Sequence, residues 1–429
     1  MRAFVAVWAG QLVSLVGSGL TSFALSVWVY NETGQATPFA LTLLFTTLPR
    51  ILLSPLAGVL GDRYNRRRLL ILSDSGSALA TLFLALFVLQ GTLQVWHVYL
   101  ITLAGSSFSA LQEPVYTASV TLLVPKNHLA RAGGMMQAGQ SAEMLLSPLL
   151  AGGLFVAVGL EGIIFIDFAT YFFAIATMLV VHIPQPAEND NLEATAVSFW
   201  QSFIFGWRYL WNRRNLLMFL LYLALVNFAL SFASALVGPL VLAFETAEAL
   251  GLVQTIAGAG MLAGSVTMSV WGGPRQRMKG IVGFVVLSSF GLTLVGSHPS
   301  VAFIATGMFV LTFGVPFSAG LSQAIFQTKV APGVQSRVFA VRSVVARSMT
   351  PVAYLTAGPL ADYVFRPLLF EGGTLAETIL GRLLGVGPAR GIGLMLTLVG
   401  VVLAVSSVLV LVYPPIRYLE KVLPDAVMT

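Results

Sequence analysis

Cysteine is absent from this 429-residue sequence, and charged residues make up only 9% of it. The lack of cysteine excludes disulfides, thiolate metal sites and cysteine nucleophiles. Soluble domains carry roughly 25% charged residues, so the scarcity of charge excludes a large soluble protein. No Walker-type nucleotide motif and no Ser/His/Asp arrangement is present, and the few histidines lack metal-ligand spacing: His97, His128, His182 and His298. We therefore expect no enzyme, no catalytic residues, no metal and no cofactor.

Hydrophobic residues account for 57% of the sequence. A membrane-spanning helix needs about 20 mostly apolar residues. By that rule the sequence predicts an all-α membrane protein with twelve transmembrane helices. The first six predicted spans are 4–29, 38–60, 69–90, 96–122, 133–158 and 162–182, and the second six are 215–242, 249–271, 280–297, 300–326, 338–363 and 391–413.

Basic residues are distributed unevenly between the predicted loops. Most of the 23 lysines and arginines fall in the segments that would share one side with the N-terminus, whereas the opposite loops hold Arg366, Arg382 and Arg390. This bias predicts a multi-pass protein of the cytoplasmic membrane with both termini in the cytoplasm. The net charge of +6 is thereby explained by orientation, and nucleic-acid binding is not expected.

The sequence predicts two six-helix bundles, residues 1–182 and 215–429, joined by a cytoplasmic linker at 183–214. Within the linker, aromatic residues at helical spacing and a basic end indicate an amphipathic interfacial helix. The two halves share paired features in the same order, among them Ser147-Pro148 and Thr350-Pro351. Such pairs indicate duplication of a six-helix unit into two pseudo-symmetric bundles.

Residues 58–68 read GVLGDRYNRRR and place an acid and four arginines between two apolar runs. Such charges must face water where two membrane helices meet. The turn resembles the motif between helices two and three of the major facilitator superfamily, with matches at Gly58, Leu60, Asp62, Arg63, Arg66 and Arg67. Asn65 replaces a family glycine, and we expect it to take the left-handed backbone of the turn.

The resemblance extends through both halves. The helix-five element Ser147, Pro148, Ala151 and Gly152 is similar to a motif associated with antiporters. Stretches such as Leu123-Val124-Pro125-Lys126 are similar to the macrolide-efflux-like branch of the superfamily. The resemblance implies the major facilitator fold and drug export against protons, and it implies that Asp62 latches the cytoplasmic side against the start of helix eleven, near Arg337.

Polar residues recur at three-four spacing within several predicted spans of the first half, where they could line one cavity. Bonding between helices is the alternative, and for serines and threonines the two are about even. The cavity candidates are Gln11, Ser109, Gln112, Tyr116 and Gln140. Asn227 and Gln323 are the uncharged candidates of the second half.

Acids within spans are natural proton carriers, because burial and a nearby base act oppositely on their ionisation. Glu113 is the first proton-coupling candidate and Glu143 the second, with Arg50 and Arg347 as partner bases. Asp74 and Asp167 lie nearer span ends, where structural pairing is expected instead.

Together these features predict a secondary transporter that exports amphipathic small molecules, such as macrolide-like drugs, in exchange for protons by alternating access, acting as a monomer in the lipid bilayer. An importer or uniporter of a small solute would need a more charged cavity. A membrane receptor or scaffold would need a larger soluble region, and a channel would need a re-entrant segment. The longest loops are 183–214 and 364–390, and no function is assigned to the latter.

Overall fold

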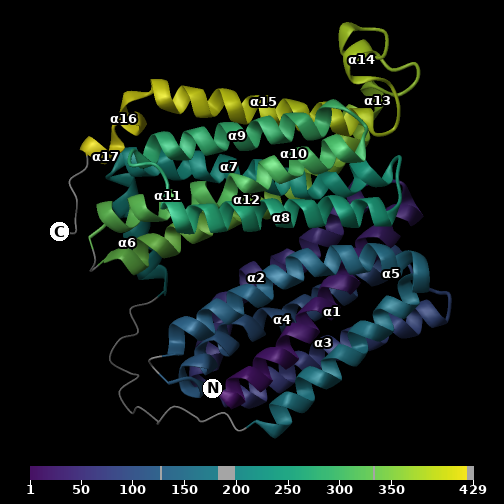
Figure 1. Cartoon of the computed structure of the whole chain (residues 1–429), viewed down its shortest axis with the longest axis vertical. Coiled ribbons are helices and arrows are strands. Elements are labelled where there is room, and N and C mark those ends of the chain that lie inside the picture. Colours follow the sequence, from purple (N-terminus) through teal and green to yellow (C-terminus); the bar gives the residue numbers. More distant parts are fainter. Residues whose placement is uncertain (126–127, 182–198, 332–333, 423–429) are drawn as a thin grey trace. The chain divides into compact units, whose positions relative to one another are not determined.

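The computed structural model of the chain describes residues 1–125, 128–181, 199–331 and 334–422 (Figure 1). Within these ranges the chain is helical and contains no strand. The chain divides into two compact units. The first contains Met1–Glu188 and Val241–Thr255, and the second contains Asn189–Leu240 and Ile256–Thr429.

The first unit is built from five long helical segments. In chain order they are α1 (Arg2–Thr33), α2 (Ala36–Arg63), α3 (Arg66–Leu89), α4 (Val95–Leu123) and α5 (Leu129–Val180). The helix of α5 is broken at Gly159, whose φ of 67° and ψ of −173° are not helical. This break separates the fifth and sixth predicted spans, which the sequence analysis places at 133–158 and 162–182.

The helices of the remaining chain begin with α6 (Phe199–Trp211), which overlaps the predicted interfacial helix. They continue with α7 (Arg214–Leu242), α8 (Ala247–Trp271), α9 (Arg277–Ser297), α10 (Val301–Phe313), α11 (Val315–Lys329) and α12 (Gln335–Pro359). The π-helix η4 (Leu360–Phe365) extends α12. The last helices are α13 (Arg366–Leu368), α14 (Ile379–Leu384), α15 (Arg390–Val412), α16 (Pro414–Arg417) and α17 (Leu419–Val422).

The all-helical membrane fold is confirmed. Among the described residues, nine helices are long and apolar enough to cross a membrane, and one of these is the double-length α5. α4 and α12 coincide with two more predicted spans, so the helices are consistent with twelve spans. The predicted span 300–326 is divided at Gly314 into α10 and α11, with Pro316 in the first turn of α11, where its missing N–H costs no hydrogen bond.

The turn between α2 and α3 differs from the expectation for Asn65. Its φ of −60° and ψ of 112° lie outside the left-handed region, and its side chain accepts a 3.1 Å hydrogen bond from the N–H of Arg68. Asn65 is therefore the N-cap of α3, and capping, rather than tolerance of a left-handed backbone, explains how it serves this turn.

Glycines allow helices to approach closely in both units, but what they meet differs. On α1, a Cβ at Gly10 would overlap Thr177, and one at Gly17 would overlap Thr170. On α9, a Cβ at Gly296 would overlap the backbone oxygen of Gly393. Small residues at such crossings let helix backbones pack closely in membranes.

The core of the second unit is a large apolar cluster contributed by α6, α7, α9, α11, α12, α15 and the C-terminal helices. Its fully buried members include Phe219 and Phe326, whose rings stack with centroids 5.7 Å apart. This cluster fixes α7 against α11 by apolar contact.

Candidate functional site

A buried carboxylate, Asp74 of α3, lies at the centre of a polar network in the first unit. Its side chain is 1% exposed. Gln112 of α4 donates to Oδ1 over 2.6 Å, and Gln11 of α1 donates to Oδ2 over 3.0 Å. Gln112 also donates to the amide oxygen of Gln11. The three side chains form a closed ring that ties together three helices.

A second buried carboxylate, Asp167 of α5, is also 1% exposed. Hydroxyls surround it: Ser18 of α1 is 3.4 Å from Oδ1 and Thr81 of α3 is 3.5 Å from Oδ2. The Ser18 hydroxyl also bonds the phenol oxygen of Tyr171 over 2.9 Å. The second acid is therefore solvated by neutral groups, as the first is.

The positions of Asp74 and Asp167 near span ends predict structural pairing, so neither acid is among the predicted site residues. A signal was available for Asp74, because Ser77 and Thr81 follow it at helical spacing on one face of α3, and all three are buried. Which residues of other helices would face that surface could not be read from the chain alone.

The two predicted proton carriers lie in less buried positions. Glu113 of α4 is exposed, and Glu143 of α5 is half-buried beside α1, where a Cβ at Gly19 would lie 3.4 Å from Cγ of Glu143. The guanidinium of Arg50 on α2 is exposed and lies close enough to interact electrostatically with Glu143. The structure thus brings Arg50 and Glu143 near one another, as a base and an acid of one unit.

The predicted cavity residues of the first half differ in their hydrogen bonds and exposure. Gln11 and Gln112 are joined through Asp74, and Ser109 shares a 3.3 Å hydrogen bond with Ser77. The Tyr116 hydroxyl is buried without a hydrogen-bond partner among the described residues. Gln140 is exposed on α5.

In the second unit, the candidate residues form hydrogen bonds within their own helix or with the next helix along the chain. Asn227 donates to the Leu223 carbonyl of its own helix over 2.9 Å. Gln323 of α11 accepts from Arg342 of α12, which also donates to Ser322 over 3.0 Å and lies 4.8 Å from the centroid of the Phe326 ring. Arg347, the other predicted partner base, is exposed.

The arginines after the α2–α3 turn bind helix ends. Arg66, 8% exposed, donates to the Ala118 carbonyl of α4 over 2.7 Å, and Nε of Arg67 donates to the Met178 carbonyl of α5 over 2.8 Å. Met178 lies in the last turn of α5, where carbonyls lack partners within the helix and cations satisfy them. The side chains of Asp62 and Arg63 lie outside the described residues, as do the surroundings of Gly58, so the predicted latch stays a prediction.

Arg337, the predicted partner of that latch, is half-buried in the first turn of α12. Its guanidinium lies 5.0 Å from the centroid of the Phe205 ring of α6. Gly206 brings α6 against the Arg337 carbonyl, where a Cβ would clash. Helix α6 therefore packs on the start of α12.

The helix-five element faces α1 on one side. Ser147 donates to the Val16 carbonyl over 3.2 Å, and Ala151 is fully buried. On the other side, a Cβ at Gly152 would lie 3.1 Å from the Ala247 carbonyl and one at Gly251 would overlap the Pro148 carbonyl, all within the first unit. The small residues of this element therefore serve close packing.

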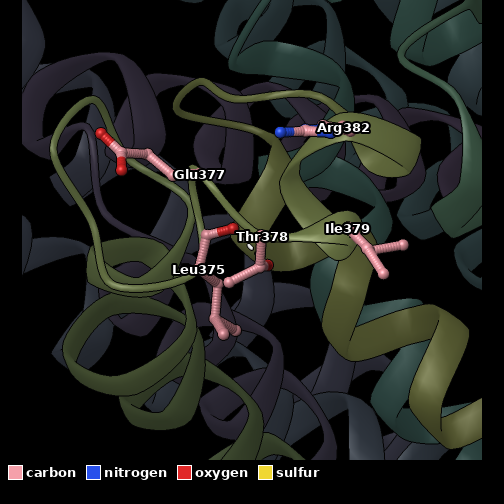
Figure 2. Close-up of a pocket in the computed structure, with 5 residues that line it drawn as sticks. All are labelled: Leu375, Glu377, Thr378, Ile379 and Arg382. Carbon is pink, nitrogen blue, oxygen red and sulfur yellow. Dashed lines mark hydrogen bonds between the residues drawn. The ribbon is translucent and has the colours of Figure 1, made fainter.

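A surface pocket of about 550 Å³ lies in the segment between η4 and α15 (Figure 2). It is lined by residues of one short stretch around the start of α14: Leu375, Glu377, Thr378, Ile379 and Arg382. This pocket belongs to the 364–390 loop and contains none of the predicted site residues.

Among the described residues, no group of three or more His, Asp or Glu side chains is placed to hold a metal ion. His97 has a local role, because its Nδ1 accepts from the N–H of Gln94 over 3.1 Å at the start of α4.

The family model of the Major Facilitator Superfamily matches residues 7–354. The chain belongs to the major facilitator superfamily. It is accordingly a multi-pass membrane transporter and not an enzyme.

Relatives of this superfamily member include exporters. It is 27% identical to macrolide efflux protein A of Streptococcus pyogenes over 365 residues, which cover 84% of this chain and 90% of that protein. It is also 27% identical over 157 residues to the enterobactin exporter EntS of Shigella flexneri, covering 37% of this chain and 38% of that protein.

Solved structures of superfamily transporters share its fold. The nucleoside transporter NupG superposes with a TM-score of 0.72 at 11% identity, covering 96% of this chain and all of that one. A bacterial homolog of the lysosomal transporter Spinster superposes with a TM-score of 0.69 at 14% identity, covering 95% of each chain. At these identities the likeness concerns the fold alone.

Proposed function

We propose that this transporter exports amphipathic small molecules, of the macrolide class or similar to it, in exchange for protons by alternating access. The observation that carries the proposal is the similarity to macrolide efflux protein A along 84% of the chain. A second exporter among the relatives supports the outward direction.

The titratable groups of the first unit support exchange against protons. Glu143 is half-buried and lies within electrostatic reach of Arg50. An acid that is ionised beside a base and neutral when separated from it can bind and release a proton as helices move. Glu113, exposed on α4, remains the other candidate, and Arg347 the other candidate base.

The proposal includes the orientation and state of the protein. Both termini lie in the cytoplasm, because the arginine-rich turn at 58–68 and most other basic loops then face inward. The transporter acts as a monomer in the cytoplasmic membrane. Its partners are the substrate, protons and lipid.

The test is accumulation of a fluorescent macrolide in drug-sensitive bacterial cells that express the wild type, Glu113→Gln or Glu143→Gln, over a range of external pH. Wild type should lower accumulation, and at least one glutamine variant should lose several-fold of this effect together with its pH dependence. Glu371→Gln, an exposed acid of the 364–390 loop, is the matched control and should behave as wild type. Equal export by both glutamine variants at every pH would contradict proton coupling through these acids.

A further inference from the structure

Two carboxylates are enclosed inside the first unit rather than at its surface. Asp74 and Asp167 are each 1% exposed, and they are the acidic side chains that the described part of the chain buries. Transfer of a carboxylate from water to an apolar interior is costly unless a counter-charge or sufficient hydrogen bonds compensate. The groups that contact each carboxylate therefore determine whether its ionised form is stable.

Among the described residues, no lysine, arginine or histidine is paired with either acid. Tyr171 of α5 is the titratable group that interacts with both. The other titratable groups on the packed helices make no hydrogen bond or ion pair with the two carboxylates: Glu32 on α1, Arg66, Arg67 and Arg68 on α3, His97, Tyr99, Glu113 and Tyr116 on α4, and Arg131, Glu143 and Glu161 on α5. Within the described part of the chain, neutral dipoles alone solvate the acids.

The ring around Asp74 can accommodate both protonation states. Each carboxylate oxygen accepts one amide N–H, which suits the ionised form. Amide oxygen and nitrogen are exchanged by a half-turn of the terminal group. After such a turn of Gln11, its Oε1 would accept the proton of a neutral Asp74 while Gln112 still donates to Oδ1, and the hydrogen bond from Gln112 to the Gln11 amide oxygen would be lost.

The hydroxyls around Asp167 can also accommodate both protonation states of the acid, and no amide group has to rotate. Ser18 and Thr81 can donate to the carboxylate or accept from the carboxylic acid, because a hydroxyl does both. Thr21 of α1 is 7% exposed and faces this acid, yet among the described residues its hydroxyl has no partner in hydrogen-bonding geometry.

Helices α1 and α3 contribute to both sites. Asp74 and Thr81 lie seven residues apart on one face of α3, about 10 Å at the helical rise. α1 contributes Gln11 to the first acid and Ser18 to the second, and Gly17 lets α1 approach so closely that a Cβ there would lie 3.1 Å from Oδ1 of Asp167. A change of charge at either acid changes the bonds that hold α1.

We propose that Asp74 and Asp167 are two proton-binding sites of the transport cycle, inside the first bundle. Each carboxylate takes up one proton from the water on one side, becomes a neutral carboxylic acid, and releases the same proton on the other side. No bond between heavy atoms is made or broken. This inference rests on the proposed exchange of substrate for protons and adds the acids that carry them.

The direct test is infrared difference spectroscopy of the full-length protein in membranes while the pH is changed. Wild type should show two carboxylic-acid C=O bands that appear as the pH falls, and Asp74→Asn and Asp167→Asn should each remove one. Glu161→Gln, which changes an exposed acid of α5, should remove neither. The absence of a titrating band assigned to either aspartate would overturn the proposal.

Transport by proteoliposomes separates proton coupling from a structural role, with radiolabelled erythromycin as the probe. Asparagine resembles the neutral acid in shape, so each variant should retain counterflow but lose flux driven by a pH gradient. Retained gradient-driven flux would overturn the proposal, and so would loss of both activities in a protein that remains folded.

A further variant tests the assignment in a protein that keeps both aspartates. Gln112→Leu keeps Asp74 but removes its strongest donor, so its infrared band should persist at a higher frequency; an unchanged frequency would overturn the assignment. If wild type moves no erythromycin under any condition, the proposed function fails for this drug class, while the infrared bands still decide whether the aspartates bind protons.

Discussion

The glycine contacts of α1 and α9 show two different ways of packing membrane helices. Glycines of α1 meet hydroxyl-bearing side chains of α5, at Thr170, Thr177 and Ser147. Two glycines of α9 meet backbone atoms, Gly291 against Gly307 of α10 and Gly296 against Gly393 of α15. A side chain can rotate away from a new contact, but a helix backbone cannot. The α1–α5 contact is therefore the adjustable one, and the α9 contacts are fixed.

The two units also differ in the charged side chains that they bury. The first unit encloses the acids Asp74 and Asp167, which can gain or lose a proton. The second unit encloses Lys329 and Arg390, whose side chains donate to the carbonyls of Glu420 and Ser297. A guanidinium stays charged under all cellular conditions. Among the described residues, the buried acids thus lie in the first unit, whereas both units bury basic side chains, Arg66 in the first and Lys329 and Arg390 in the second.

The largest expected effect tests the fixed packing. Gly296→Ala places a Cβ against the backbone oxygen of Gly393, and overpacking of this kind costs about 1–3 kcal/mol. Gly10→Ala on α1 should cost clearly less, because Thr177 can rotate. Thermal unfolding of the detergent-solubilised variants measures both costs. Equal losses of melting temperature would show that the α1–α5 contact and the α9 contacts tolerate an added methyl group equally.

A smaller effect tests the permanent charge of the second unit. Arg342→Lys keeps the charge but loses the planar fork that reaches both Gln323 and Ser322, and it weakens the contact with the Phe326 ring. We expect a loss of about 1–2 kcal/mol in unfolding free energy, since a typical hydrogen bond contributes about 0.5–1.5 kcal/mol and a cation–π contact about 0.5–1 kcal/mol. Arg347→Lys, at an exposed position of the same helix, is the control. A lysine variant as stable as wild type would show that charge alone suffices.

The helical fold could be predicted from the sequence because membrane spans are encoded locally, by length and hydrophobicity. The predicted span 69–90 corresponds to α3 at Arg66–Leu89, and 391–413 corresponds to α15 at Arg390–Val412. The break at Gly314 was less evident, because Pro316 suggested an interruption without showing that two helices follow one another directly.

The candidate sites could be predicted only in part, because they depend on which helix faces pack together. The sequence predicts Gln11 and Gln112 as cavity residues, but the position of Asp74 near a span end predicts structural pairing for the acid that joins them. Depth along a helix does not determine burial when neighbouring helices supply amides and hydroxyls. The polar stripe of its predicted span favours Glu113 as a proton carrier, although its side chain is exposed.

The smallest expected effects concern the turns that follow α2 and α8. Asn65→Ala removes the N-cap of α3 and should cost about 1 kcal/mol, whereas Asn65→Asp should retain the cap. Gly272 has a φ of 73° and open space around its Cβ position, so Gly272→Ala should cost about 1 kcal/mol from backbone strain alone. Melting temperatures of the three variants check these values. A loss with Gly272→Ala but none with Asn65→Ala would show that only the second turn depends on its residue type.

The single-residue break at Gly159 joins the two halves of α5 without an intervening loop. The half that carries Glu143 and the half that carries Asp167 are therefore mechanically linked at this hinge, with almost no slack in the chain between them. If the half that carries Glu143 tilts, the half that carries Asp167 must move with it. The hydroxyl groups that contact Asp167 would then change position. An insertion of flexible residues at this position should uncouple the two movements while leaving each helix intact.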